Sequence, residues 1–269
     1  MQAQSGMTRS NHPYAAVGAG DSTLFVFGGI EPKHVVPDGL HLQGIARAFK
    51  SFAETHRTIV LKRPARSDRG YSQARMAEDY AEAVEELAPS GQVAIMGIAA
   101  GGTIAQMFAG MFPNRVSRLV LVSTAYRVSE PGRQALNRGV ALAENGEYRA
   151  LNREMIRRLY PSRVASAFYG ALAWLLPGLS TEDDPDEFIC EAEAGAAADA
   201  SGYLGAISAQ SLLMCGDRDF FYDAGDVART AQLIPDCELV LFKNQGHGLP
   251  RTHADEINAR VRPFLASRG

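Results

Sequence analysis

The sequence is short of cysteine, of net charge and of long apolar runs. Its 269 residues include three cysteines, at positions 190, 215 and 237, and no CxxC pair, which excludes a disulfide framework and a CxxC zinc site. A formal net charge of -3 provides no basic surface for nucleic acid or for an anionic membrane. The longest apolar-leaning stretch, residues 164–178, contains serine and tyrosine and is too short to cross a bilayer.

These absences limit which partners and which cellular location we expect for the protein. We expect a small molecule as partner, with no nucleic acid, no membrane, no metal ion and no cofactor, and a cytoplasmic location; a homodimer stays open. The first 21 residues have no basic region followed by an apolar core, so they do not resemble a secretory signal. We expect them to form a short disordered leader.

Short apolar runs alternate with helix-length segments along most of the chain. Six runs, "STLFVFGG", "RTIVLKRP", "QVAIMGIA", "SRLVLVST", "AQSLLMCGD" and "CELVLFKN", are typical of strands buried on both faces. Between the second and third runs, Met76, Tyr80, Val84 and Leu87 recur at helical spacing. The alternation predicts an α/β fold with a mostly parallel central sheet flanked by helices.

A long segment without strand signals interrupts this alternation. Residues 125–207 read as several helices broken by glycine and proline, and an insertion between core strands usually covers a sheet as a lid. We therefore predict a core formed by residues 1–124 and 208–269 and a helical cap over 125–207. The acidic run "TEDDPDEF" within the cap predicts a solvated loop or a helix start.

The stretch "IMGIAAGGTIAQ" places a small-residue turn between a strand and a helix. Its spacing does not fit the GxGxxG dinucleotide fingerprint. It resembles the nucleophile elbow of the α/β-hydrolase family, with Gly97 and Gly101 at the two small positions and Ala99 where the family carries its nucleophile, usually serine.

Two later segments strengthen this resemblance. "LLMCGDRD" provides Asp219 at the family's acid position, with Asp217 as an open alternative, and "NQGHGLP" provides His247 in the usual histidine loop. The order of nucleophile, acid and histidine agrees with this family. The resemblance covers roughly residues 20–124 and 208–267.

The resemblance also implies an oxyanion hole formed by the N–H groups of Ile30 and Ala100. Family members usually have His-Gly-x after the first parallel strand, whereas this chain has Gly28-Gly29-Ile30. Gly28 therefore replaces a side chain that often braces this loop.

The implied activity is hydrolysis of an ester, lactone or thioester by a Ser-His-Asp mechanism. Because alanine cannot attack, we expect this chain to be a nucleophile-to-alanine variant with little activity; natural loss of the serine is the lesser option. A lyase or cyclase that uses His247 as a base, or a ligand receptor, remains as an alternative. A dehalogenase or epoxide hydrolase ranks lower, since Ala100 stands where dehalogenases usually place tryptophan.

The pocket predicted from the sequence is apolar, so the expected substrate is hydrophobic or neutral. This prediction leaves the substrate itself and the oligomeric state open. The residues expected to contact the substrate come from both the core and the cap: Gly29, Ile98, Phe168, Trp174, Phe220, Phe221 and Leu249.

Overall fold

The computed structural model describes residues 2–31, 34–65, 69–159 and 185–267. An eight-stranded sheet with the order β1-β2-β4-β3-β5-β6-β7-β8 forms its centre. Pairing is parallel from β4 through β3, β5, β6 and β7 to β8, whereas β1 pairs with β2 and β2 with β4 in antiparallel register. The predicted mostly parallel α/β architecture is confirmed.

The six predicted runs are the six parallel strands. Phe25 and Val26 of β3, on opposite faces, are both at most 1% exposed, as expected of a strand covered on both sides. The strands are β3 (Ser22–Phe27), β4 (His56–Leu61), β5 (Val93–Ile98), β6 (Val116–Val122), β7 (Gln210–Gly216) and β8 (Cys237–Phe242).

The expectation of a disordered leader is wrong. β1 (Ala3–Met7) and β2 (Pro13–Val17) form an antiparallel pair at the edge of the sheet, with Val17 opposite Ala3 and Thr58. Val17 is fully buried. The polar and alanine-rich segment lacks the apolar run that marks a strand, but it pairs with the edge that β4 would otherwise leave open, which satisfies backbone groups on both strands.

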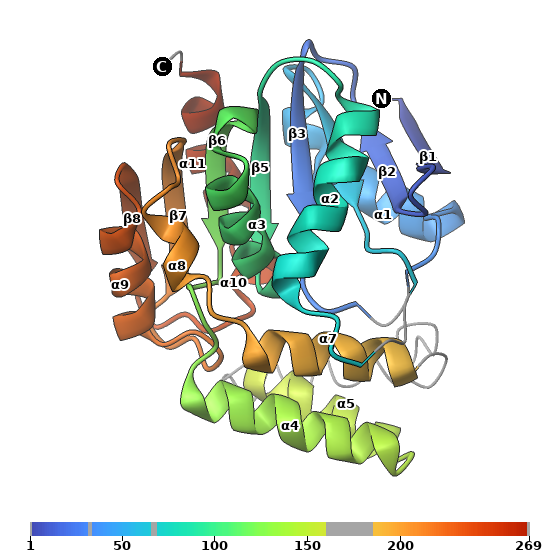
Figure 1. Cartoon of the computed structure of the whole chain (residues 1–269), viewed down its shortest axis with the longest axis vertical. Coiled ribbons are helices and arrows are strands. Elements are labelled where there is room, and N and C mark those ends of the chain that lie inside the picture. The colour runs from blue at the N-terminus through green and yellow to red at the C-terminus, as the bar shows by residue number, and fades with distance from the viewer. Residues whose placement is uncertain (1, 32–33, 66–68, 160–184, 268–269) are drawn as a thin grey trace.

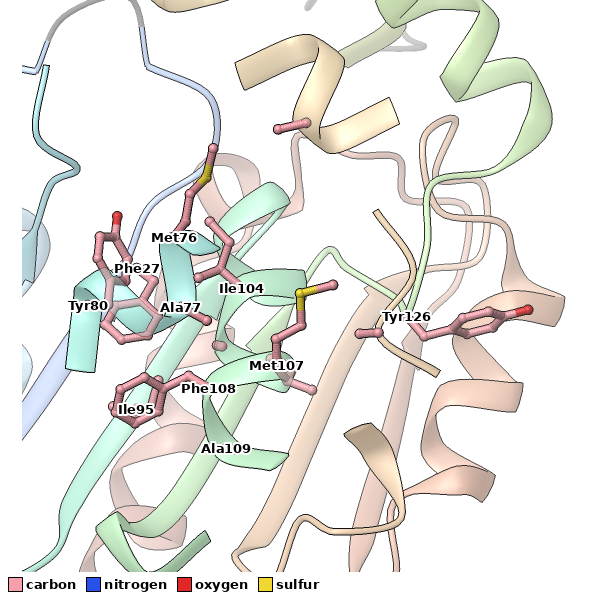
Figure 2. Close-up of a cluster of buried hydrophobic side chains, with 14 of the residues drawn as sticks. Phe27, Met76, Ala77, Tyr80, Ile95, Ile104, Met107, Phe108, Ala109 and Tyr126 are labelled. Carbon is pink, nitrogen blue, oxygen red and sulfur yellow. The ribbon is translucent and has the colours of Figure 1, made fainter. Parts of the chain in front are cut away.

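Helices cover both faces of the sheet (Figure 1). On one face, α2 (Gln73–Leu87), α3 (Ala100–Met111) and α9 (Ala224–Leu233) enclose the larger apolar core. Figure 2 shows part of this core, where Tyr80 of α2 packs against Phe27 at a ring distance of 4.5 Å. The predicted face of α2 is confirmed, since Met76, Tyr80 and Val84 are all buried.

The other face carries α1 (Gly39–Ala48), followed by η1 (Lys50–Phe52), and α11 (Ala254–Ala266), preceded by the short α10 (Leu249–Thr252). A second short turn, η2 (Pro113–Arg115), leads into β6. α11 contains Pro263. None of the helices in the described parts of the chain is long and apolar enough to cross a membrane.

Between β6 and β7 the regular elements among the described residues are helices, apart from an isolated antiparallel bridge between Arg127 and Asp199. This part contains α4 (Glu130–Glu144), α5 (Tyr148–Leu159), α7 (Pro185–Ala197) and α8 (Ser201–Leu204). Figure 1 shows α4, α5 and α7 beyond the carboxyl ends of the parallel strands. α7 begins inside the acidic run, yet Glu187 and Glu191 are buried. The division into core and cap at residues 125 and 207 stays a prediction.

Candidate active site

The turn after β5 has a strained backbone at its centre. Ala99 has φ 52° and ψ -123°, a combination that residues other than glycine rarely adopt. The Ala99 N–H donates to the carbonyl of Val122 at 3.0 Å, and its carbonyl accepts from the Gly102 N–H at 2.9 Å. The half-buried Ala99 therefore occupies a tightly held corner between strand and helix.

The two flanking glycines are required by contacts with the backbone. A Cβ atom at Gly97 would lie 2.6 Å from the Cα atom of Gly102, and one at Gly101 would lie 2.1 Å from the carbonyl oxygen of Gly28. Neither backbone neighbour can move away cheaply. The elbow therefore packs directly against the loop that follows β3.

This loop brings Gly29 next to Ala99. A Cβ atom at Gly29 would lie 3.2 Å from the Cβ atom of Ala99, so residues 28–30 border the space in front of the methyl group. Ala100 begins α3, and the first N–H groups of a helix have no partner within it. Ile30 and Ala100 are both half-buried; their roles as oxyanion donors stay a prediction.

Asp219 and His247 form a hydrogen-bonded pair. The Nδ1 atom of His247 lies 2.9 Å and 3.1 Å from the two carboxylate oxygens of Asp219, whose side chain is fully buried. The same carboxylate accepts from the N–H groups of Phe221 at 2.9 Å and Tyr222 at 3.1 Å. These donors hold the carboxylate in place and stabilise its charge.

The neighbouring Asp217 has a different partner. Its exposed carboxylate accepts from the backbone N–H of Asn244 at 2.7 Å, which ties the turn after β7 to the loop after β8. Of the two candidate acids, Asp219 is thus the one in contact with the histidine.

Aromatic rings fix the orientation of His247. Tyr222 stacks on the imidazole at a centroid distance of 5.7 Å, and Phe221 meets it edge-on at 5.0 Å. The loop that carries His247 also passes close to the end of β7. A Cβ atom at Gly216 would lie 2.2 Å from the Gln245 carbonyl oxygen, so this approach requires glycine at residue 216. With Nδ1 directed at Asp219, Nε2 is the ring nitrogen left for chemistry.

The elbow, the acid and the histidine follow β5, β7 and β8, which lie in one parallel section of the sheet. The carboxyl ends of parallel strands meet at one edge, where ligands bind in open α/β sheets. Ala99, Asp219 and His247 therefore belong to one candidate site at this edge of the sheet.

The residues predicted to contact substrate differ in their surroundings. Ile98 and Phe220 are half-buried, whereas Phe221 is 7% and Leu249 1% exposed. Leu249 packs in the core on the α11 side of the sheet. Phe168 and Trp174 lie outside the described residues.

A cavity of about 980 Å³ lies beside Asp219 and Phe220, and its lining includes five arginines and three carboxylates. Glu154 pairs with Arg138 at 3.0 Å and with Arg158 at 2.7 Å. The Arg158 guanidinium also lies 4.5 Å above the Phe220 ring. The cavity's arginines are Arg138, Arg153, Arg157, Arg158 and Arg218. None of these arginines was among the site residues predicted from the sequence, although the four arginines within "YRALNREMIRRL" were a signal.

One curated relative covers most of this chain. It is the polyketide synthase ThaQ of Burkholderia thailandensis, 29% identical over an alignment of 260 residues that covers 88% of this chain and 12% of that protein. The chain thus spans about an eighth of the length of the curated relative it matches.

Two solved structures have the same fold. MGS-M2, an α/β hydrolase enzyme from a Medee basin deep-sea metagenome library, superposes with a TM-score of 0.83 at 19% identity, covering 96% of this chain and 95% of that one. The enol-lactonase from Burkholderia xenovorans LB400 superposes with a TM-score of 0.79 at 16% identity, covering 98% and 100%.

A family model described as the alpha/beta hydrolase fold matches residues 52–253. This match includes the elbow, the acid, the histidine loop and the helices between β6 and β7. With three quarters of its length matched in this way, the chain belongs to the α/β-hydrolase fold family.

Proposed function

We propose that this chain carries the machinery of a carboxylic ester hydrolase of the serine type, disabled at one atom. The observation that carries the proposal is the Asp219–His247 pair, held by two further N–H donors, in a chain whose Ala99 has the strained backbone of a nucleophile elbow. A serine there would differ from alanine by one oxygen. Natural loss of the hydroxyl is the lesser alternative to its replacement.

Each residue of the proposed site has a separate task. His247 removes the proton of the attacking hydroxyl through Nε2 and later donates it to the leaving group, while Asp219 orients the ring and stabilises its positive charge. The N–H groups of Ile30 and Ala100 stabilise the oxyanion. Without the hydroxyl, these groups can act only on a water molecule, so the residual rate is small.

An ester, lactone or thioester of a small molecule is the proposed substrate class. The enol-lactonase among the similar structures makes a lactone the first compound to test. The sequence favoured a hydrophobic or neutral substrate, whereas the arginines beside Asp219 favour a carboxylate or another anion at one end. Paired neutral and carboxylate-bearing 4-nitrophenyl esters distinguish these two options.

Restoring the nucleophile tests the proposal. Ala99→Ser should raise ester or lactone hydrolysis by about a thousandfold or more over the alanine chain, because covalent catalysis by the triad becomes available. It should also allow labelling by a serine-directed fluorophosphonate. The control is Ala99→Ser with His247→Ala, which should lose both signals. An Ala99→Ser protein that is folded but inert toward esters, thioesters, lactones and the fluorophosphonate would refute the proposal.

The histidine–acid pair in a chain without a nucleophile also suits a lyase or cyclase that uses His247 as a general base. In that case the alanine chain is already active and His247→Ala abolishes the activity. A receptor, by contrast, binds its ligand without turnover even after Ala99→Ser.

A further inference from the structure

Five charged or polar side chains away from the proposed triad are buried together. They lie where the loop after β3, the end of β4 and α7 meet. We call them the cap–loop cluster; its members, all between 4% and 7% exposed, are His34, Lys62, Arg63, Glu187 and Glu191. Burying so many charges is costly unless each one is paired, so the contacts within the cluster have to be specific.

Two carboxylates of α7 bind the backbone of the loop after β3. Glu191 accepts from the backbone N–H of Glu31 at 3.1 Å, and Glu187 accepts from the backbone N–H of His34 at 3.2 Å. The second oxygen of Glu191 contacts the Arg63 guanidinium and Nε2 of His34. Arg63 thus compensates the negative charge of Glu191, whose carboxylate accepts the hydrogen bond from the loop backbone.

The charge states agree with this arrangement. Burial, together with nearby Arg63 and Lys62, lowers the pKa of His34 to about 2, so its ring is neutral. Nε2 of this neutral ring lies between the Glu191 carboxylate and the Arg63 guanidinium. Lys62 pairs with the side chain of Glu31 at 2.5 Å. Both the backbone N–H and the side chain of Glu31 are therefore held, the first by Glu191 and the second by Lys62.

Glu31 directly follows Ile30, the expected oxyanion donor. Fixing the Glu31 N–H fixes the peptide plane between these residues, which leaves few torsions free between that plane and the Ile30 N–H. Gly28 offers no side chain to brace the loop, and Gly29 approaches Ala99 closely. The hydrogen bond from the Glu31 N–H to Glu191 of α7 is in a position to brace the loop, as a side chain at residue 28 would otherwise do.

We propose that Glu191 is a positioning residue that holds the oxyanion loop, residues 28–31, from the cap side. The packing of α7 against the core then sets the position of the Ile30 N–H. This inference rests on the proposed hydrolase function. It predicts an effect on the transition state, where the oxyanion develops, rather than on substrate binding.

The kinetic test uses three variants in the Ala99→Ser background. Glu191→Ala removes the acceptor and should lower kcat by about tenfold to a hundredfold with KM nearly unchanged, a part of what deletion of an oxyanion donor costs. Glu191→Gln keeps one acceptor oxygen and should recover most of kcat. Glu193→Ala is the matched control, because Glu193 lies on the same helix and pairs with Arg69 at the surface; its kcat should not change.

A second measurement needs no activity. In the chain as it stands, hydrogen exchange of the Glu31 amide, followed by NMR, should be at least tenfold faster in Glu191→Ala than in the unchanged chain or in Glu193→Ala. An inert Ala99→Ser enzyme would refute the hydrolase proposal, while amide exchange would still decide whether Glu191 holds the loop.

Two results would overturn the inference. One is an unchanged kcat and unchanged Glu31 exchange in Glu191→Ala. The other is a loss of activity that lies entirely in KM. If Glu191→Ala fails to fold, Glu191→Gln and Glu187→Gln replace it, since they weaken the acceptors without removing them. Glu191→Gln should accelerate exchange of the Glu31 amide, and Glu187→Gln that of the His34 amide. Unchanged exchange in both variants would likewise refute the inference.

Discussion

At residue 99 the backbone is held in a conformation that an alanine adopts only under strain. φ is 52° and ψ is -123°, and a non-glycine residue there costs about 1–3 kcal/mol. Neighbouring hydrogen bonds to Val122 and Gly102 maintain it. The strain is understandable if the corner exists to present a reactive side chain, which alanine no longer provides.

Ala99→Gly should therefore stabilise the protein. We expect the free energy of unfolding to rise by about 1 kcal/mol, because relief of strain exceeds the extra entropy of glycine in the unfolded chain. Urea denaturation measures the change. Ala100→Gly, at the first position of α3, is the control and should destabilise by up to about 1 kcal/mol. A lower stability of Ala99→Gly would show that residue 99 is not strained.

At this scale the sequence indicated the elbow glycines, the acid and the histidine, because each stands at a fixed place in a short motif. It assigned the acid to Asp219 but left Asp217 as an open alternative, since both follow β7 and only the direction of each side chain separates them. Glu191 carried no recognisable motif, and the arginine-rich run in α5 did not show that its side chains line a cavity beside Asp219. Both outcomes depend on how the helices after β6 pack.

At the scale of the elements, the elbow joins two parts of the sheet. Gly101 of α3 lies against the carbonyl groups of Phe27 and Gly28 at the end of β3, so the start of α3 and the oxyanion loop share one tight contact. Sequence periodicity located β3, β5 and α3 separately. It could not show that the missing side chain at residue 101 makes room for the neighbouring strand's loop.

Gly101→Ala should be severely destabilising. The added methyl group would lie 2.1 Å from a carbonyl oxygen, and we expect a loss of about 3 kcal/mol or more, since backbone on both sides must shift. The matched control is Gly44→Ala in α1, where nothing lies within 4 Å and helix propensity should add up to about 1 kcal/mol. Thermal unfolding of both variants checks the contrast, and equal effects would contradict the packing argument.

β1 and β2 illustrate what local patterns miss. Their segments carry few β-branched or aromatic residues, so nothing in them marks a strand. β2 pairs with the open edge of β4, and β1 pairs in turn with β2. The edge of β4 exists only once the sheet has formed.

At the scale of the whole molecule, α7 and the core meet through buried charges instead of apolar contacts alone. His34 is neutral in this environment, because burial lowers its pKa from 6.5 to about 2. In the unfolded chain the ring gains a proton below about pH 6.5. The stability that His34 contributes is thus fully present above pH 6.5 and is lost as the pH falls toward 2.

Replacing His34 should reduce the acid sensitivity of the fold. Between pH 7 and pH 5 the unchanged chain should lose about 2 kcal/mol more of its unfolding free energy than His34→Gln, as the difference in proton uptake requires. Urea denaturation at several pH values gives these free energies. Between pH 8 and pH 9 both proteins should show parallel profiles, and parallel profiles at pH 5 as well would mean that His34 is protonated in the folded state.

The sequence by itself determined the α/β class, the six parallel strands, the helical character between β6 and β7, and the motif positions of Ala99, Asp219 and His247. These follow from periodicity and from steric rules at single residues, which act locally. Only the tertiary structure decided that the N-terminal segment adds two strands to the edge of the sheet, that Asp219 and not Asp217 contacts His247, and that Glu191 reaches the loop beyond β3. Those outcomes depend on pairing and burial between segments distant in the chain, where the cost of an unpaired backbone group or charge selects the partner.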